Sequence, residues 1–391
     1  MTRLLSLTLA AFAIGISEFV LVGLLPTIAA ETGVSVGAAG LLVTAYALAI
    51  TVLSPLLTSW FSRFDSRWVL VALMGAFAIG NTLVATAAGF AALLAGRVLA
   101  GAAHGTVFAI GAPAAAALVP REKASRAISL VFLGLTVAMV VGVPLGTVLG
   151  NAVGWRATFV VVAVLGGLSA AAIAALIPST GAGEAVSLRG QLALLRDRPL
   201  ALTYVVTGLG FGATFAVFTY LEPLLSEGAG YNATGVTILL LLFGAATVVG
   251  NLAGGALADR RGTGPVIHVA LVGLAVCFTG VLLSATSAVA IAITVAVWGV
   301  FAFLISPPLQ AHAVALARGR GAGAEKAASG LNIAAFNAGI ALASWAGGVV
   351  LEAAGATSTP WVALVLVLLA LAVSPGIISA RARGAVREGV S

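Results

Sequence analysis

The sequence predicts an all-α membrane protein of twelve transmembrane helices, arranged as two six-helix bundles related by pseudo-symmetry. Three observations lead to this fold class. The 391 residues are 61% hydrophobic and only 8% charged, whereas ordinary globular domains carry roughly 25% charged residues. Long charge-free runs fill the chain, and each provides the ~20 residues that a helix needs to cross about 30 Å of hydrocarbon. Basic residues gather between these runs, as they do in membrane proteins.

Charge-free windows define the twelve expected helices. They cover residues 4–28, 36–60, 68–87, 90–117, 127–151, 157–177, 200–222, 232–257, 265–285, 288–312, 328–351 and 358–379. Two divisions are inferred, because residues 68–120 carry one charge and residues 265–317 carry none, yet each stretch is long enough for two helices. We place the turns near residues 86–89 and 284–287. A membrane β-barrel would instead show alternating segments of about ten residues.

The basic residues predict the orientation in the membrane. Arg3 precedes an apolar run as in a signal peptide, but we expect no cleavage, because the run is too long, contains Glu18 and is followed by eleven further spans. Twelve spans place both ends of the chain on one side. All basic residues except Arg97 and Arg156 fall in the connections and tails of that side. The positive-inside rule therefore predicts a multi-pass protein of the cell membrane with both termini in the cytoplasm.

Composition and charge exclude soluble enzymes and nucleic-acid binders. The net charge of +7 would suit an anionic partner, but membrane topology accounts for the basic residues, so we expect no nucleic acid. The single cysteine, Cys277, forbids a disulfide within the chain. No Cys or carboxylate lies near the histidines in sequence, which disfavours a metal site. We expect a monomer in the lipid bilayer that needs neither a cofactor nor a metal.

A duplicated organisation is visible along the chain. Residues 178–199, the longest polar interval, are interpreted as a cytoplasmic linker between a six-helix bundle over 1–177 and a second bundle over 200–391 with a short cytoplasmic tail. Within the linker, residues 188–195 form either a short amphipathic helix or a plain loop. The charge-poor double spans recur in both halves, so internal duplication is the simplest account. Parallel halves of this kind place a substrate path near the bilayer midplane, at their interface.

Short motifs carry a family resemblance. Residues 255–262 (GALADRRG) match the loop signature G-x-L-A-D-R-x-G, whereas the equivalent first-half loop has Arg63 and Ser66 in place of its Asp and Gly. Residues 97–101 (RVLAG) are similar to an intramembrane R-x-x-q-G motif, and residues 142–146 (GVPLG) are a variant of the antiporter signature G-P-x-x-G-G. On these motifs the whole chain resembles the major facilitator superfamily. The first helix with its loop and the Gly-Trp-Arg segment at 154–156 look most like the bacterial twelve-span drug/proton antiporters, which include chloramphenicol-efflux and sugar-efflux proteins.

Glu18 and Arg97 are the only charges expected deep in the membrane. Residue counting puts both roughly 12 Å below the outer boundary, where they can pair. A lone charge at the bilayer centre costs about 2.5–3.5 kcal/mol even on the lenient scale, so such residues normally face a cavity and a partner. Either Glu18 is a proton carrier tuned by Arg97, or the two form a static pair that fixes helix packing. His104, on nearly the same helical face as Arg97, either extends a proton path or forms a structural hydrogen bond.

Two glycine motifs have structural interpretations as well as functional ones. Gly142, Gly146 and Gly150 recur every four residues, so they predict close helix packing, and such smooth faces would let the two halves rock against each other. Pro144 would free backbone groups and bend the same helix. In the loop at 255–262, Gly255 and Gly262 would permit a tight turn, and the resemblance implies a conformational latch formed with Asp259 and Arg260. Positive-inside topology alone would explain the arginines of that loop.

Aromatic and amide side chains within the spans suit a flat, amphiphilic organic ligand. Each aromatic residue taken singly is more often a packing or lipid-facing residue, whereas an amide in hydrocarbon needs a partner. The candidate substrate-binding residues are Tyr46, Phe211, Phe215, Phe218, Trp298, Asn332, Phe336 and Asn337.

The resemblance implies a secondary active transporter that exports small amphiphilic compounds, amphenicol-type antibiotics foremost, in exchange for protons. Sugar or nucleoside efflux and passive facilitation on the same fold are the alternatives, although a facilitator does not require a buried acid such as Glu18. An intramembrane enzyme is a remote alternative, because Asp65, Asp197 and Asp259 all fall in loops and leave no aspartyl dyad within the membrane.

Overall fold

The computed structural model describes residues 2–120, 124–179, 188–318, 320 and 323–375. Within these ranges, twelve helical segments are long and apolar enough to cross a membrane, which confirms the predicted fold class. They cover Thr2–Gly23, Val36–Phe61, Ser66–Ala85, Phe90–Ala117, Ala127–Val153, Trp155–Leu176, Arg198–Phe218, Ala233–Arg261, Thr263–Ser284, Ala288–Ala317, Ala324–Ala354 and Ala356–Val373. The two inferred turns are confirmed, since helices end at Ala85 and Ser284 and resume at Phe90 and Ala288.

Several spans are divided into shorter helical elements. The first half contains α1 (Thr2–Phe19), the 3-10 turn η1 (Val20–Gly23), α2 (Leu25–Thr32), α3 (Val36–Ala39), α4 (Leu41–Phe61), α5 (Ser66–Ala85), α6 (Phe90–Ala117), α7 (Ala124–Val137), the π-helical turn η3 (Ala138–Gly142), α8 (Val143–Val153) and α9 (Trp155–Leu176). The first span ends earlier than predicted, because Pro26 begins a new helix, α2, in whose first turn it needs no N–H partner.

The second half follows the same plan. It contains α10 (Leu188–Leu194), α11 (Arg198–Val206), the π-helical turn η4 (Thr207–Phe211), α12 (Gly212–Phe218), α13 (Leu221–Pro223), the π-helical turn η5 (Leu224–Gly228), α14 (Ala233–Arg261), α15 (Thr263–Ser284), α16 (Ala288–Leu304), α17 (Ser306–Ala317), α18 (Ala324–Ala354), the 3-10 turn η6 (Ala356–Ser358) and α19 (Thr359–Val373). The helix α10 corresponds to the helical alternative for the linker.

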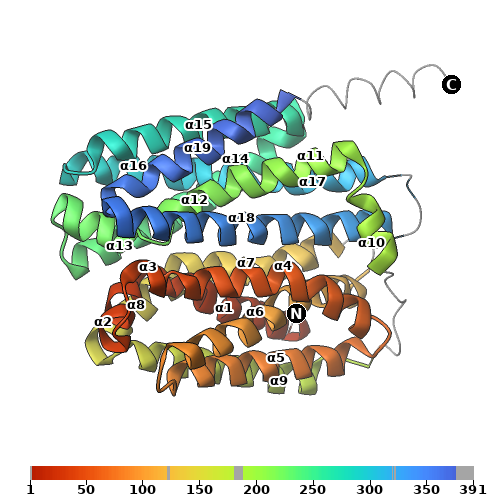
Figure 1. Cartoon of the computed structure of the whole chain (residues 1–391). Helices are drawn as coiled ribbons and strands as arrows, with labels where there is room; N and C mark the ends of the chain where they lie inside the picture. The colour runs from red at the N-terminus through yellow and green to blue at the C-terminus, as the bar shows by residue number, and fades with distance from the viewer. Residues whose placement is uncertain (1, 121–123, 180–187, 319, 321–322, 376–391) are drawn as a thin grey trace.

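The two halves lie side by side as separate groups of helices (Figure 1). In the first half α6 packs on α4 and α5, and α9 packs on α5; in the second, α16 packs on α14 and α15. We call the end of the molecule that carries α10 the linker end, and the end that carries α2, α3 and α13 the distal end (Figure 1). The boundary between the halves is the seam.

The halves approach each other closely toward the distal end of the seam. The Gly37 amide donates a 2.8 Å hydrogen bond to Glu352 Oε1 across it. The turn η3 and helix α8 pack on α14, and a methyl group at Gly244 would lie 2.6 Å from the Met139 carbonyl oxygen. The linker-end part of the same span, α7, packs instead on α1 and α6. The distal side of the seam is therefore closed in this conformation.

The predicted glycine stripe packs closely, but within one half. A methyl group at Gly142, Gly146 or Gly150 would lie 2.5–2.8 Å from side chains of the first span, respectively those of Ile16, Val20 and Leu24. The expectation that this face lets the two halves rock is therefore wrong, because the stripe does not face the seam. Pro144 lies in the first turn of α8, which follows the π-helical turn η3 directly, so the helical hydrogen-bond pattern is interrupted at the predicted place.

The second half repeats this packing between its eleventh and seventh spans, and it offers a stability test. A methyl group at Gly339 on α18 would overlap the backbone of Gly208 in η4, whereas one at Gly330 on the same helix would meet nothing within 4 Å. We expect Gly339→Ala to lower the unfolding free energy by about 1–3 kcal/mol, the usual cost of overpacking. Gly330→Ala should be neutral or slightly stabilising, because alanine favours a helix. Thermal unfolding in detergent measures both, and equal melting temperatures would contradict this packing.

Candidate functional site

Arg97 is buried in the first half and is held by backbone oxygens. Its Nη1 donates to the Ser17 carbonyl oxygen at 2.7 Å and to Ser17 Oγ at 3.2 Å, and its Nε donates to the Leu42 carbonyl oxygen at 3.2 Å. Ser17 Oγ in turn donates to Asn81 Oδ1 at 2.8 Å. The guanidinium carbon lies 3.9 Å from the centre of the Tyr46 ring, a cation–π geometry. A residue of α6 thus ties α1 and α4 together.

Glu18 lies beside this arrangement without joining it. The residue follows Ser17 on α1, and its charge lies close enough to interact with that of Arg97. No ion pair joins Glu18 to Arg97, although both are described, so the direct pair expected from the sequence is not formed in this conformation. The Glu18 side chain is half-buried, while Ser17 and Phe19 on either side are buried. Glu18 therefore lies near a fixed positive charge without pairing with it.

Tyr46 connects Arg97 to His104. The Tyr46 hydroxyl lies 3.2 Å from His104 Nδ1, and the two rings are 5.6 Å apart. Tyr46 was a candidate for substrate binding, but its ring face and its hydroxyl are both occupied by the two residues predicted to move protons. His104 also contacts Phe108, with ring centres 5.3 Å apart. The structure thus brings three predicted residues together in a manner that their positions in the sequence did not specify.

The predicted aromatic residues of the second half gather into one cluster. The ring of Phe211 lies 5.6 Å from Phe215 and 4.8 Å from Phe336, and Phe215 lies 5.8 Å from Phe218. Phe218 continues the contacts to Trp298. We call this set, together with Phe243, which stacks on Phe218 at 4.7 Å, the aromatic cluster.

Phe19 extends the aromatic cluster across the seam. Its ring lies 6.2 Å from Phe215 and 6.5 Å from Phe218, although it belongs to the first half. Phe19 follows Glu18 directly on α1, so the backbone of the acidic residue lies beside the aromatic cluster. Sequence reasoning missed Phe19 and Phe243, since a single phenylalanine in an apolar span resembles any other packing residue.

The two predicted asparagines differ in whether their polar side-chain atoms have hydrogen-bond partners. Asn332 accepts from Thr207 Oγ1 at 2.8 Å and donates to Gln310 Oε1 at 2.7 Å, so its amide is part of a closed network. Asn337 donates to the Ile333 carbonyl oxygen at 3.0 Å, but its buried Oδ1 has no hydrogen-bond partner within the described ranges. The buried Trp298 Nε1 also has no partner there. Asn332 therefore fixes helix packing, whereas Asn337 and Trp298 keep unused polar atoms.

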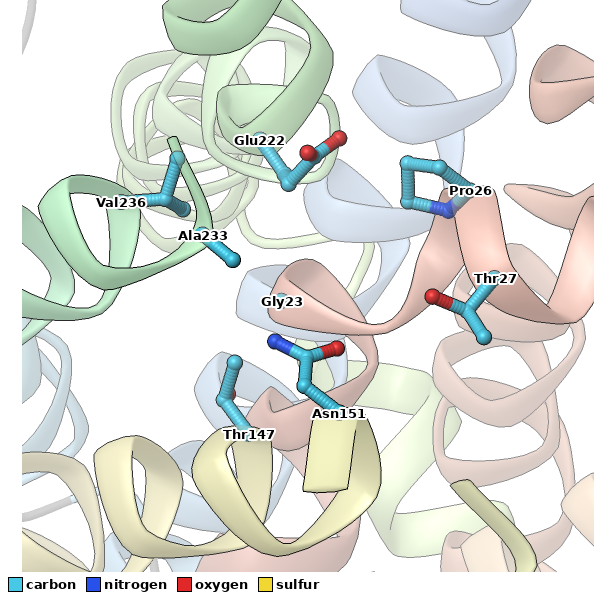
Figure 2. Close-up of a pocket in the computed structure, with 8 residues that line it drawn as sticks. All are labelled: Gly23, Pro26, Thr27, Thr147, Asn151, Glu222, Ala233 and Val236. Atoms are coloured by element: carbon cyan, nitrogen blue, oxygen red, sulfur yellow. The ribbon is translucent and has the colours of Figure 1, made fainter. Parts of the chain in front are cut away.

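A small cavity of about 140 Å³ opens at the distal end of the seam. We call it the distal pocket; it is lined by Gly23, Pro26, Thr27, Thr147 and Asn151 from the first half and by Glu222, Ala233 and Val236 from the second (Figure 2). Glu222 lies on one side of the space, and Thr27 and Asn151 lie on the other (Figure 2). Glu222 could not be singled out from the sequence, because it falls at the end of a span, where acidic residues are ordinary.

Comparisons with known proteins fit this architecture. A model of the Major Facilitator Superfamily matches residues 7–325. The chain belongs to this superfamily. It is 42% identical over 366 residues to the MFS-type transporter YtbD of Bacillus subtilis, covering 93% of this chain and 92% of the relative. A chloramphenicol resistance protein of Streptomyces lividans is 37% identical over 86% of this chain and 85% of that protein.

Solved structures of the superfamily share the fold. A bacterial homologue of the human lysosomal transporter Spinster, in an inward-facing and occupied conformation, superposes with a TM-score of 0.73 at 16% identity, covering 97% of this chain and 94% of that one. The protein is thus a multi-pass membrane transporter of the Major Facilitator Superfamily and not an enzyme.

The superfamily loop signature takes an unexpected form here. Gly255 lies within the long helix α14, which continues to Arg261, so the expected tight turn at Gly255 is wrong. Gly262 does adopt a positive φ of 83° and separates α14 from α15, as a turn glycine should. Asp259 and Arg260 are exposed and form no hydrogen bond or ion pair with other described residues. Whether these residues form a latch stays a prediction.

Proposed function

We propose that this transporter exports small amphiphilic compounds in exchange for protons, with Glu18 as the proton carrier. The observation that carries the proposal is Glu18, a half-buried residue that forms no ion pair with any described residue and lies beside an Arg97 that backbone oxygens hold in place. A carboxylate locked to a guanidinium would keep its charge, whereas this one is free to bind and release a proton. Structural ion pairs normally show the opposite arrangement, with both partners fixed.

Protonation of Glu18 changes the balance between the two orientations of the transporter. With Glu18 ionised, its charge offsets that of Arg97; with Glu18 protonated, the Arg97 charge is unopposed. A change in charge that costs a different free energy in each orientation shifts their populations, and this differential is what coupling requires. In the exchange cycle, Glu18 binds a proton when the distal end is open and releases it when the linker end is open. His104, whose Nδ1 contacts the Tyr46 hydroxyl, extends the proton path that begins at Glu18.

The proposed orientation in the membrane follows from the basic residues of the linker end. The connections at that end hold most of the arginines and lysines, so we assign the linker end and both termini to the cytoplasm. The distal end then faces outward, where the proton concentration is higher in a respiring bacterium. A monomer contains all the residues that this cycle uses. We also propose that Asp259 and Arg260 latch the linker end when it closes.

The aromatic cluster is the proposed substrate site. Its flat faces suit a planar apolar group, and the unpartnered Trp298 Nε1 and Asn337 Oδ1 supply one donor and one acceptor for polar groups of the ligand. Buried polar atoms without partners cost roughly 1–3 kcal/mol each, which a ligand that bonds them recovers. Likeness to a chloramphenicol resistance protein favours an amphenicol-type antibiotic. Phe19 would place this ligand next to Glu18.

Drug susceptibility of a bacterial host tests this function. We expect expression of the protein in a host without its own drug pumps to raise the inhibitory concentration of an amphenicol and to lower the accumulation of the labelled compound. A proton uncoupler should abolish the lower accumulation, because export depends on the proton gradient. Low accumulation that persists with the uncoupler would contradict proton coupling, and a response confined to sugars or nucleosides would contradict the proposed substrate class.

A further inference from the structure

The distal pocket contains a carboxylate that the proposed transport cycle does not use. Glu222 lies on α13, half-buried between the two halves of the transporter. Across the pocket it faces Thr27 and Asn151, whose side chains are polar but uncharged (Figure 2). The Ser226 hydroxyl is close enough to stabilise its charged form. An ionised Glu222 would therefore hold a negative charge in a partly dehydrated seam, which is costly when no cation is near.

The elements around Glu222 provide no such cation. Helix α13 packs on η5, η1 and α2. On these elements the titratable groups are Glu227, which repels Glu222, and Glu31, whose carboxylate is bonded to Arg156 and to the Trp155 Nε1. The described residues of α8 include no titratable group, and Arg260 and Arg261 of α14 lie at the opposite end of that helix.

The distal pocket depends on the closed seam. Both halves line it, so separation of the halves at the distal end would expose Glu222 to water. The closed state is stabilised by the hydrogen bond from Gly37 to Glu352 and by Tyr220, whose hydroxyl lies against Gly40 and Gly348 on the two sides of the seam. The environment of Glu222 therefore changes with the conformation of the transporter.

We propose that Glu222 is a second proton site, in which protonation from the outer side favours closure of the distal end of the seam. The assignment of Glu222 to the outer side rests on the proposed function. The link between proton binding and closure of the seam is independent of that function. The proton is taken from one side and returned to it when the seam opens. Glu222 therefore changes how readily the emptied transporter closes toward the outside, and it leaves the number of protons exchanged per substrate unchanged.

The sign of the pH dependence follows from the surroundings of the carboxyl group. Burial raises the pKa of Glu222 in the closed seam, the Ser226 hydroxyl opposes this rise, and the Glu227 charge adds to it. In the open seam the group is hydrated, and its pKa returns toward the ordinary value of about 4.3. Between these two pKa values the closed state binds more protons, so the ratio of closed to open protein rises as pH falls, by at most about tenfold per pH unit.

Distances between spin labels on the two halves test this inference. Val153 at the end of α8 and Val289 at the start of α16 are 71% and 74% exposed at the distal end. We would label cysteines at these positions in the Cys277→Ala protein, reconstituted in lipid without substrate. The Glu18→Gln background removes the proposed carrier, so that any remaining pH response belongs to another group.

In the Glu18→Gln background we expect the population with the short distance to grow as pH falls from about 8 to about 5. Adding Glu222→Gln should remove this pH-dependent growth and leave the short distance predominant at every pH. Adding Glu227→Gln or Glu222→Asp should preserve the pH-dependent growth. A pH response that is unchanged by Glu222→Gln, or that is absent from the Glu18→Gln protein, would overturn the inference. Loss of proton-driven export would be a separate result, because these distances are measured without transport.

Discussion

Glu18→Gln is expected to abolish proton-driven accumulation while leaving substrate exchange intact. Glutamine keeps the size of the side chain and the polar contacts near Arg97, but it cannot bind and release a proton. In proteoliposomes a gradient of one pH unit is worth about 1.4 kcal/mol per proton, enough for a substrate concentration ratio of about tenfold. The wild-type protein should approach this ratio, and the variant should stop at a ratio of about one.

The control for this experiment is an acidic residue outside the transport path. Glu325 is exposed at the start of α18, so Glu325→Gln should accumulate substrate as the wild type does. Exchange of labelled for unlabelled substrate without a pH gradient shows whether Glu18→Gln still folds and binds. Uphill accumulation by Glu18→Gln at the wild-type level would remove Glu18 from the role of proton carrier.

Arg97→Lys is expected to disable transport although it keeps the positive charge. The planar guanidinium bonds the Ser17 and Leu42 carbonyl oxygens at once and lies over the Tyr46 ring, and a lysine ammonium cannot reproduce this geometry. Loss of one hydrogen bond to a charged group costs about 1.5–3 kcal/mol, so we expect the transport rate to fall by roughly 10- to 100-fold.

Arg156→Lys is the matched control for that substitution. Arg156 makes the same kinds of contact where its side chain is 38% exposed: it pairs with Glu31, donates to the Ala87 carbonyl oxygen at 3.2 Å and lies 4.3 Å from the centre of the Trp155 ring. Contacts at such exposed positions contribute little to stability. Its replacement should leave the transport rate and the melting temperature nearly unchanged. If Arg97→Lys transported at the wild-type rate, the charge of Arg97 alone would matter, and its contacts with α1 and α4 would have no role in transport.

The fold could be predicted from the sequence because the membrane imposes it. The length and polarity of each span follow from the thickness of the bilayer, so even the turns hidden in charge-poor stretches, near residues 86–89 and 284–287, were placed correctly. The closure of η3 and α8 on α14 at the distal end has no such signature. This closure depends on which small residues meet across the seam. The sequence of a glycine stripe does not show which neighbouring helix the stripe packs against. The stripe at Gly142, Gly146 and Gly150 accordingly packs on the first span.

The candidate residues could be named from the sequence, but the contacts between them could not. A charge within a span is rare, so Glu18 and Arg97 stood out, and the periodicity on the seventh span identified Phe211, Phe215 and Phe218. Their partners carried no comparable signal. Phe19 is one apolar residue among many, and Glu222 is an acid at the end of a span; only the folded chain brings each of them to the seam.

Proton movement driven by substrate is the most direct test of the central claim. In proteoliposomes with the membrane potential held at zero, a substrate gradient directed out of the lumen should drive protons inward, and a pH-sensitive dye in the lumen should report acidification. The account predicts this acidification for the wild-type protein and its loss in Glu18→Gln. Substrate leaving the lumen at the wild-type rate with no change in lumenal pH would contradict proton exchange.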